Sequence, residues 1–175
     1  MSRGKPSYGG IRYLKPFETL SIYRFSMDYP PVCWIEFNPK GRRERGDVVF
    51  HFPDHEKVFL TWGNLEDAKF SNAYDHAEHS LKIMKGSRQV KEFERVKHDS
   101  LRINSHQAPY NRVKISQPSP RLFSGRKTMK RETLSLHLHC DRLSRYFVVY
   151  AMLSPSAPED FETLFLDMVR SFKCH

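Results

Sequence analysis

The sequence predicts an α+β fold in which two main helices flank an antiparallel β-sheet. Three observations support this prediction. Short apolar segments alternate in polarity or are rich in β-branched and aromatic residues, and turn residues separate them at short intervals. Two further segments, one in mid-chain and one at residues 161–172, repeat their apolar residues at the helical period. A chain of 175 residues is long enough to bury the core that such a fold needs.

The first part of the chain predicts a loose leader followed by a meander of strands. Residues 1–10 contain three glycines, one proline and two serines, so we expect residues 1–19 to be a leader and residues 20–175 to form a single domain. Short apolar segments separated by turn residues then predict four strands. These strands span residues 20–27, 32–37, 47–52 and 58–62.

A mid-chain helix is predicted over residues 65–85, with Asn64 as its N-cap and Gly86 just beyond its end. Three further strands follow, and then a loop over residues 116–128 that is rich in Pro, Ser and Gly. These strands are expected at residues 90–96, 101–103 and 108–115.

The last third of the chain predicts a β-hairpin and a helix. Residues 133–140 alternate, so their leucines point to one face of the strand and His137 and His139 to the other. Residues 146–152 are almost continuously apolar, which is typical of a central strand buried on both faces. Residues 161–172 form an amphipathic helix, and the spacing of Ser156 and Glu159 predicts a capping box.

Charge is the strongest bulk property of the sequence, with a formal net charge of +9. Residues 85–131 alone hold thirteen Lys and Arg residues against three acidic ones. Such a field attracts polyanions or an acidic protein face, although a solvated basic surface that serves solubility gives the same pattern. Strand alternation is also expected to send some of these cations to opposite faces of the sheet. The candidate partner-binding residues are Arg112, Lys114, Arg121, Arg126, Lys127, Lys130 and Arg131.

Histidines provide the candidate metal ligands. His137 and His139 share one face of a strand, and His76 and His79 lie three residues apart on the mid-chain helix. Either pair could bind a metal if further ligands came from elsewhere. The alternatives are a sheet surface covered by a helix or by solvent for the first pair, and the polar face of an amphipathic helix for the second.

No catalytic residues and no cofactor are predicted, because the chain has neither a glycine-rich phosphate motif nor a GxSxG nucleophile motif. Its three cysteines are widely spaced and form neither a disulfide framework nor a CxxC motif. We therefore expect reduced thiols in a cytoplasmic protein. No apolar segment approaches the roughly 20 residues that span a bilayer, so no membrane partner is expected.

Several short motifs, taken in order, resemble the PsbP/Mog-like family. They are Phe25-Ser26-Met27-Asp28-Tyr29-Pro30-Pro31 with Trp34, Asn104-Ser105-His106-Gln107-Ala108-Pro109-Tyr110, Tyr146-Phe147-Val148-Val149-Tyr150, and a final Ser171-Phe172. The resemblance implies an α/β/α sandwich around an antiparallel sheet. It also implies a mostly non-enzymatic binding role, since some members bind the Ran GTPase and others attach to photosystem II. One departure is Ser105-His106, where the family often has Gly in the turn.

The sequence thus predicts a non-catalytic binding module that recognises an acidic partner, most simply a protein, through its basic face. Two alternatives stay open. One is a nucleic-acid-binding protein, because Phe93, Tyr110 and Phe123 lie among the basic residues. The other is a small metal-binding protein or metallo-enzyme that uses a histidine pair.

Overall fold

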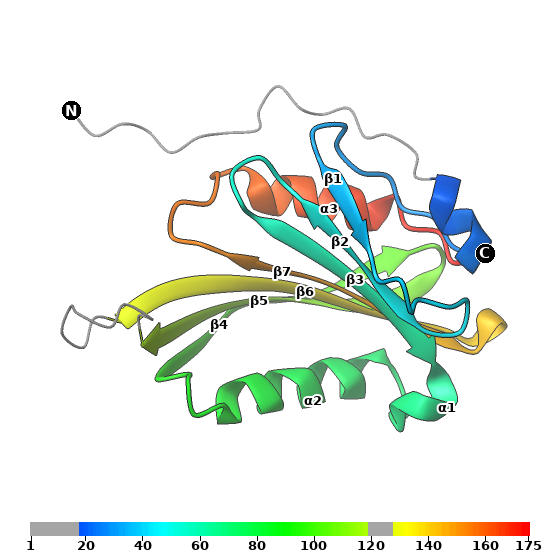
Figure 1. Cartoon of the computed structure of the whole chain (residues 1–175). Helices are drawn as coiled ribbons and strands as arrows, with labels where there is room; N and C mark the ends of the chain where they lie inside the picture. Colours follow the sequence, from blue (N-terminus) through cyan, green and yellow to red (C-terminus); the bar gives the residue numbers. More distant parts are fainter. Residues whose placement is uncertain (1–17, 119–127) are drawn as a thin grey trace.

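The computed structural model describes residues 18–118 and 128–175, and its centre is a seven-stranded antiparallel sheet (Figure 1). The strand order is β1-β2-β3-β7-β6-β5-β4. The strands are β1 (Trp34–Phe37), β2 (Gly46–His51), β3 (Lys57–Asn64), β4 (Glu92–Ile103), β5 (His106–Pro118), β6 (Thr128–Cys140) and β7 (Arg145–Leu153). β7 is the central strand and forms a hairpin with β6, as predicted, but only one of its faces is fully buried: Tyr146, Val148 and Tyr150 are half-buried and Met152 is exposed.

Helices cover both faces of the sheet, which gives the predicted α/β/α sandwich (Figure 1). α2 (Ala73–Gly86) packs on β5 and β6, and α3 (Phe161–Arg170) lies on the opposite face. The short helix α1 (Leu65–Ala68) precedes α2, and two 3₁₀ helices complete the described elements: η1 (Glu18–Tyr23) and η2 (Asp141–Leu143). None of the helices in these residues is long and apolar enough to cross a membrane.

The main core lies between α3 and the sheet. The apolar stripe of α3 is buried as its periodicity predicts, and it packs in one cluster with Leu134, Leu136 and Leu138 of β6. A smaller cluster of Leu81, Val113 and Ile115 lies under α2. Even-numbered residues of β5 and β6 therefore face α3, and odd-numbered ones face α2.

The strand predicted at residues 20–27 is wrong. η1 occupies its first part, Arg24 then has a left-handed backbone (φ 59°), and Ser26 makes a single bridge to Lys173. The alternation indicated burial only in part, because Leu20, Phe25 and Met27 are buried whereas Ile22 is exposed.

The mid-chain helix is divided in two, contrary to the prediction of one helix. Lys69 ends α1 with a left-handed backbone (φ 55°). Asn64 makes no capping hydrogen bond, whereas the Asn72 side chain accepts one of 2.9 Å from the Asp75 N–H and caps α2.

The capping box predicted for α3 does not form. Asp160 is the N-cap and makes no side-chain cap bond, and Ser156 Oγ instead lies 3.0 Å from Ser154 Oγ. The two strands predicted at residues 90–96 and 101–103 form one strand, β4, with a register shift between Arg95 and Lys97.

The turn between β4 and β5 forms although glycine is absent. Asn104 and Ser105 both have positive φ (46° and 72°), as the favoured two-residue hairpin turn requires, and Ile103 pairs with His106.

Candidate functional site

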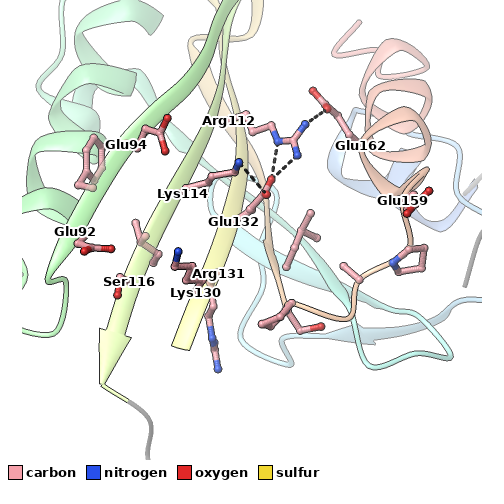
Figure 2. Close-up of a pocket in the computed structure, with 17 residues that line it drawn as sticks. Glu92, Glu94, Arg112, Lys114, Ser116, Lys130, Arg131, Glu132, Glu159 and Glu162 are labelled. Atoms are coloured by element: carbon pink, nitrogen blue, oxygen red, sulfur yellow. Dashed lines mark hydrogen bonds and ion pairs between the residues drawn. The ribbon is translucent and has the colours of Figure 1, made fainter. Parts of the chain in front are cut away.

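A pocket of about 760 Å³ lies on the α3 face of the sheet, beside the segment that leads into α3 (Figure 2). We call it the α3-side pocket. Strands β4, β5 and β6 supply one side of it, and residues 153–159 with Glu162 supply the other. Its lining is mixed: Leu153, Pro155 and Pro158 are apolar, while glutamates, lysines and arginines contribute charge.

Arg112 holds the pocket together by joining β5, β6 and α3. Its guanidinium donates to Glu132 (Nε–Oε2 2.6 Å) and to Glu162 (Nη1–Oε2 2.7 Å), as Figure 2 shows. Burial alone would lower the pKa of Arg112, but the hydrogen bond and charge of Glu132 and the charge of Glu162 raise it. Tyr110 adds a hydrogen bond of 2.8 Å to Glu162. Arg112 is therefore a structural cation whose charge is already matched.

Lys114 and Lys130 are the pocket cations most exposed to an incoming ligand. Lys114 lies between two carboxylates in the strand register, Glu94 on β4 and Glu132 on β6. Its Nζ is 3.9 Å from Glu132 Oε1, and half of its side chain is exposed. Lys130 is exposed and has no ion pair among residues 18–118 and 128–175.

Lys130 and Arg131 point to opposite faces of the sheet, as strand alternation predicts. Arg131 donates to Met152 Sδ (3.2 Å) on β7, away from Lys114. Of the other candidate partner-binding residues, Arg121, Arg126 and Lys127 fall outside the described residues. The partner-binding role of the whole set stays a prediction.

Some cations of the basic stretch, residues 85–131, form ion pairs with carboxylates from distant elements. A count of charges within the stretch cannot show these pairs. Arg95 pairs with Glu78 of α2 at 2.5 Å, and Lys97 lies 3.6 Å from Glu162 of α3. Glu132, just beyond the stretch, binds Arg112. The pocket consequently carries both signs of charge rather than a uniform positive field.

Three of the four predicted histidines, His76, His137 and His139, come together between α2 and β6. His76 Nδ1 lies 3.1 Å from His139 Nε2, and His137 Nε2 lies 3.1 Å from Ser80 Oγ. His79 is exposed, with its ring centroid 5.1 Å from that of Phe70.

Burial is the main cause of the altered pKa values in this histidine cluster. It lowers the pKa of His137 to about 3, with smaller contributions from the charges of His76 and His139. It likewise lowers the pKa of His76 to about 4, again with neighbouring histidines contributing. The neutral rings are suited to packing between helix and sheet, and metal binding here stays a prediction.

A second cluster of potential metal ligands, which the sequence did not indicate, lies at the start of β5, at the other end of this strand from the α3-side pocket. There His106, Cys140, Cys174 and His175 bring their side chains together, although they come from three separate segments. The cysteines are 34 residues apart, so no spacing motif marked them.

Comparisons with solved structures place this architecture among known folds. The solution structure of cyanobacterial PsbP (CyanoP) from Synechocystis sp. PCC 6803 aligns with 98% of this chain and 98% of its own, at 12% identity and a TM-score of 0.63. The crystal structure of the Ran-binding protein Mog1p from Saccharomyces cerevisiae aligns with 93% of this chain and 95% of its own, at 10% identity and a TM-score of 0.62.

The likeness is one of structure. No family model and no curated protein matches the sequence. At identities this low, the alignments show the fold alone. The shared fold confirms the resemblance to the PsbP/Mog-like family that the sequence motifs suggested. The chain has the PsbP/Mog1-like fold, a seven-stranded antiparallel sheet with helices packed against it.

Proposed function

We propose that this protein is a non-catalytic binding module that holds an acidic segment of a partner protein in the α3-side pocket. The pocket carries the proposal. It is large enough for several side chains, it has apolar residues beside charged ones, and its exposed lysines belong to a chain of net charge +9. Lys114 and Lys130 are the residues that would meet the partner's carboxylates.

The lining of the pocket favours a protein over a nucleic acid as the partner. Glutamates project from both of its sides: Glu92, Glu94, Glu132, Glu159 and Glu162. A phosphate backbone carries a charge on every nucleotide and would be repelled by these groups. A peptide can instead place a few carboxylates beside the lysines and apolar side chains against Leu153 and Pro158.

The solved structures give limited support to a binding role. Mog1p is named a Ran-binding protein, and that name applies to the yeast protein. For this chain it is a precedent for binding by a protein of this fold, and the partner proposed here follows from the pocket alone.

The test compares two charge reversals of equal size. The double variant Lys114→Glu/Lys130→Glu changes the pocket, and Lys82→Glu/Lys85→Glu changes the exposed lysines of α2 on the opposite face. Fluorescence anisotropy would measure binding of a labelled peptide in which a few glutamates alternate with leucines, and of a single-stranded oligonucleotide of matched charge, each across a salt series.

We expect the pocket variant to weaken binding of the glutamate–leucine peptide about tenfold, because two favourable charge contacts become repulsive. The α2 variant should weaken it much less, since it alters only the long-range field. Equal losses in both variants would show binding to net charge and contradict the proposal. Preferential oligonucleotide binding that only the pocket variant loses would favour the nucleic-acid alternative instead.

A further inference from the structure

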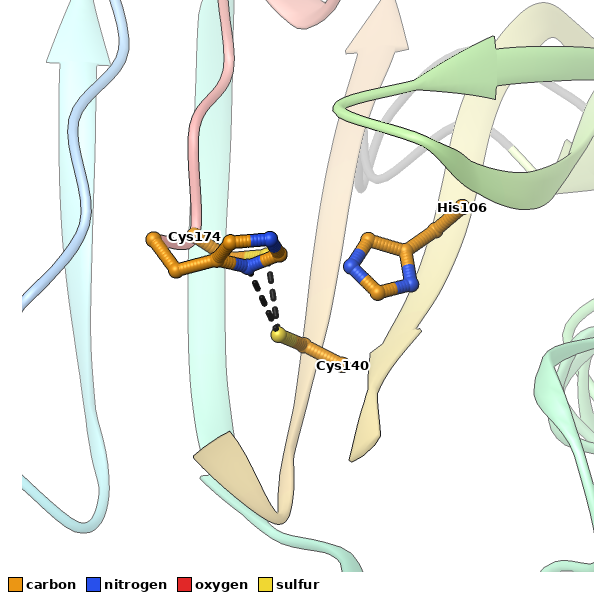
Figure 3. A group of neighbouring side chains, drawn as sticks. His106, Cys140 and Cys174 are labelled. Atoms are coloured by element: carbon orange, nitrogen blue, oxygen red, sulfur yellow. Dashed lines mark hydrogen bonds between the residues drawn. The ribbon is translucent and has the colours of Figure 1, made fainter. Parts of the chain in front are cut away.

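Four potential metal ligands converge where the start of β5, the end of β6 and the segment after α3 meet. They are His106, Cys140, Cys174 and His175, and one ligand atom from each lies within 4.8 Å of all the others. Figure 3 shows the side chains of His106, Cys140 and Cys174 pointing toward one another. We propose that these residues form a tetrahedral Cys₂His₂ site for a structural zinc ion.

The separations between the ligand atoms are close to those of this ligand set, although some are shorter. Cys174 Sγ lies 2.9 Å from Cys140 Sγ, and His175 Nδ1 lies 3.1 Å from Cys174 Sγ and 3.5 Å from Cys140 Sγ. Ligands on a tetrahedral zinc ion are about 3.3 to 3.8 Å apart, given the usual Zn–S and Zn–N lengths. Small side-chain rotations would therefore bring all four atoms around one ion.

His106 contributes an independent observation. Its Nε2 atom is buried and has no hydrogen-bond partner among the described residues. A buried imidazole nitrogen without a partner costs free energy, and a metal ion is one group that would satisfy it. A disulfide between Cys140 and Cys174 would explain the sulfur contact but not the approach of two imidazoles.

Two polar side chains lie next to the cysteines. The side-chain N–H of Asn104 donates to Cys174 Sγ at 3.3 Å, as outer-shell donors do at metal thiolates. Arg145 pairs with Cys140 in the register of β6 and β7, and it is buried with two guanidinium nitrogens lacking a hydrogen bond in the described part of the chain.

The choice of zinc follows from the ligands and from their burial. Two thiolates with two imidazoles match structural zinc sites, which use four protein ligands and leave no open position. Cys140 and Cys174 are fully buried, and only His175 is exposed. The ion would fasten the segment after α3 to the β4–β5 turn, roughly 25 Å along β5 from the α3-side pocket.

The experiment uses the full chain, purified with reductant and without a histidine tag. Elemental analysis would measure zinc per chain, and titration with Co²⁺ would detect the visible absorption of a tetrahedral site and the charge-transfer band of Co²⁺–thiolate bonds. The test variant is Cys140→Ser/Cys174→Ser. Its matched control is Cys33→Ser, which removes a buried cysteine outside the cluster.

We expect stoichiometric zinc in the wild type, and cobalt–thiolate absorption that the control keeps and the double variant loses. A second variant, Asn104→Gly, keeps the positive-φ turn while removing the donor to Cys174, and should lower zinc affinity about tenfold. Absence of bound zinc and of cobalt–thiolate absorption in the reduced wild type would overturn the proposal. Cobalt–thiolate absorption that persists in the double variant would overturn it as well.

Discussion

Replacing His137 with glutamine should remove a defined part of the protein's sensitivity to acid. His137 is 2% exposed, and burial, together with the charges of His76 and His139, lowers its pKa from 6.5 to about 3. In the unfolded chain the ring has its ordinary pKa, so below pH 6.5 the unfolded state binds a proton that the folded state does not. Stability is therefore retained above pH 6.5 and falls as the pH decreases toward 3.

The size of the loss at pH 5 depends mainly on the unfolded-state pKa. One pKa unit corresponds to about 1.4 kcal/mol, and pH 5 lies about 1.5 units below 6.5, so His137 should cost about 2 kcal/mol there. His137→Gln keeps a polar group beside Ser80 but cannot titrate. The difference in unfolding free energy, variant minus wild type, should therefore increase by about 2 kcal/mol when the pH is lowered from about 7.5 to 5.

Urea denaturation at a series of pH values measures this difference directly. The other histidines of the cluster also titrate, but they are present in both proteins and largely cancel in the comparison. Parallel stability curves for wild type and variant would refute the reasoning, because they would mean that His137 protonates equally well in both states.

Three further substitutions test the fold. Ser105→Gly relieves a left-handed backbone (φ 72°) and should stabilise the protein by up to about 1 kcal/mol in thermal unfolding; an unchanged or lower Tm would argue against strain there. Phe165→Ala removes a fully buried ring and should cost about 3 to 5 kcal/mol in urea denaturation, whereas a cost below about 1 kcal/mol would place the ring outside the core. Gly63→Ala puts a Cβ 2.5 Å from the Tyr146 hydroxyl and should destabilise by about 1 to 3 kcal/mol, and wild-type stability would show that the ring moves freely.

The elements that the sequence predicts best have local causes. α3 has an apolar stripe at helical spacing, and β7 is a nearly continuous apolar run. In each case the local pattern alone predicts the type of element. Residues 20–27 show the limit of this reasoning. Their alternation marks Leu20, Phe25 and Met27 as buried correctly, but a 3₁₀ helix and a left-handed Arg24 replace the strand and leave Ile22 exposed.

The sites are less predictable because they depend on contacts between distant segments. The histidine pairs were visible, yet their meeting needed the packing of α2 on β6. The Cys₂His₂ group has no spacing motif, since its ligands come from the start of β5, the end of β6 and the segment after α3. The basic stretch was visible as charge, but Glu78 and Glu162, which neutralise part of it, belong to helices elsewhere in the chain.

Mapping a bound acidic peptide onto the molecule tests the central claim most directly. Backbone amide chemical shifts would be recorded by NMR while a peptide of alternating glutamates and leucines is added. We expect the shifts to change at Lys114, Ser116, Lys130 and Leu153 around the α3-side pocket, with α2 unaffected. Changes spread evenly over exposed lysines, or centred on Lys82 and Lys85 of α2, would contradict the assignment of the pocket as the docking site.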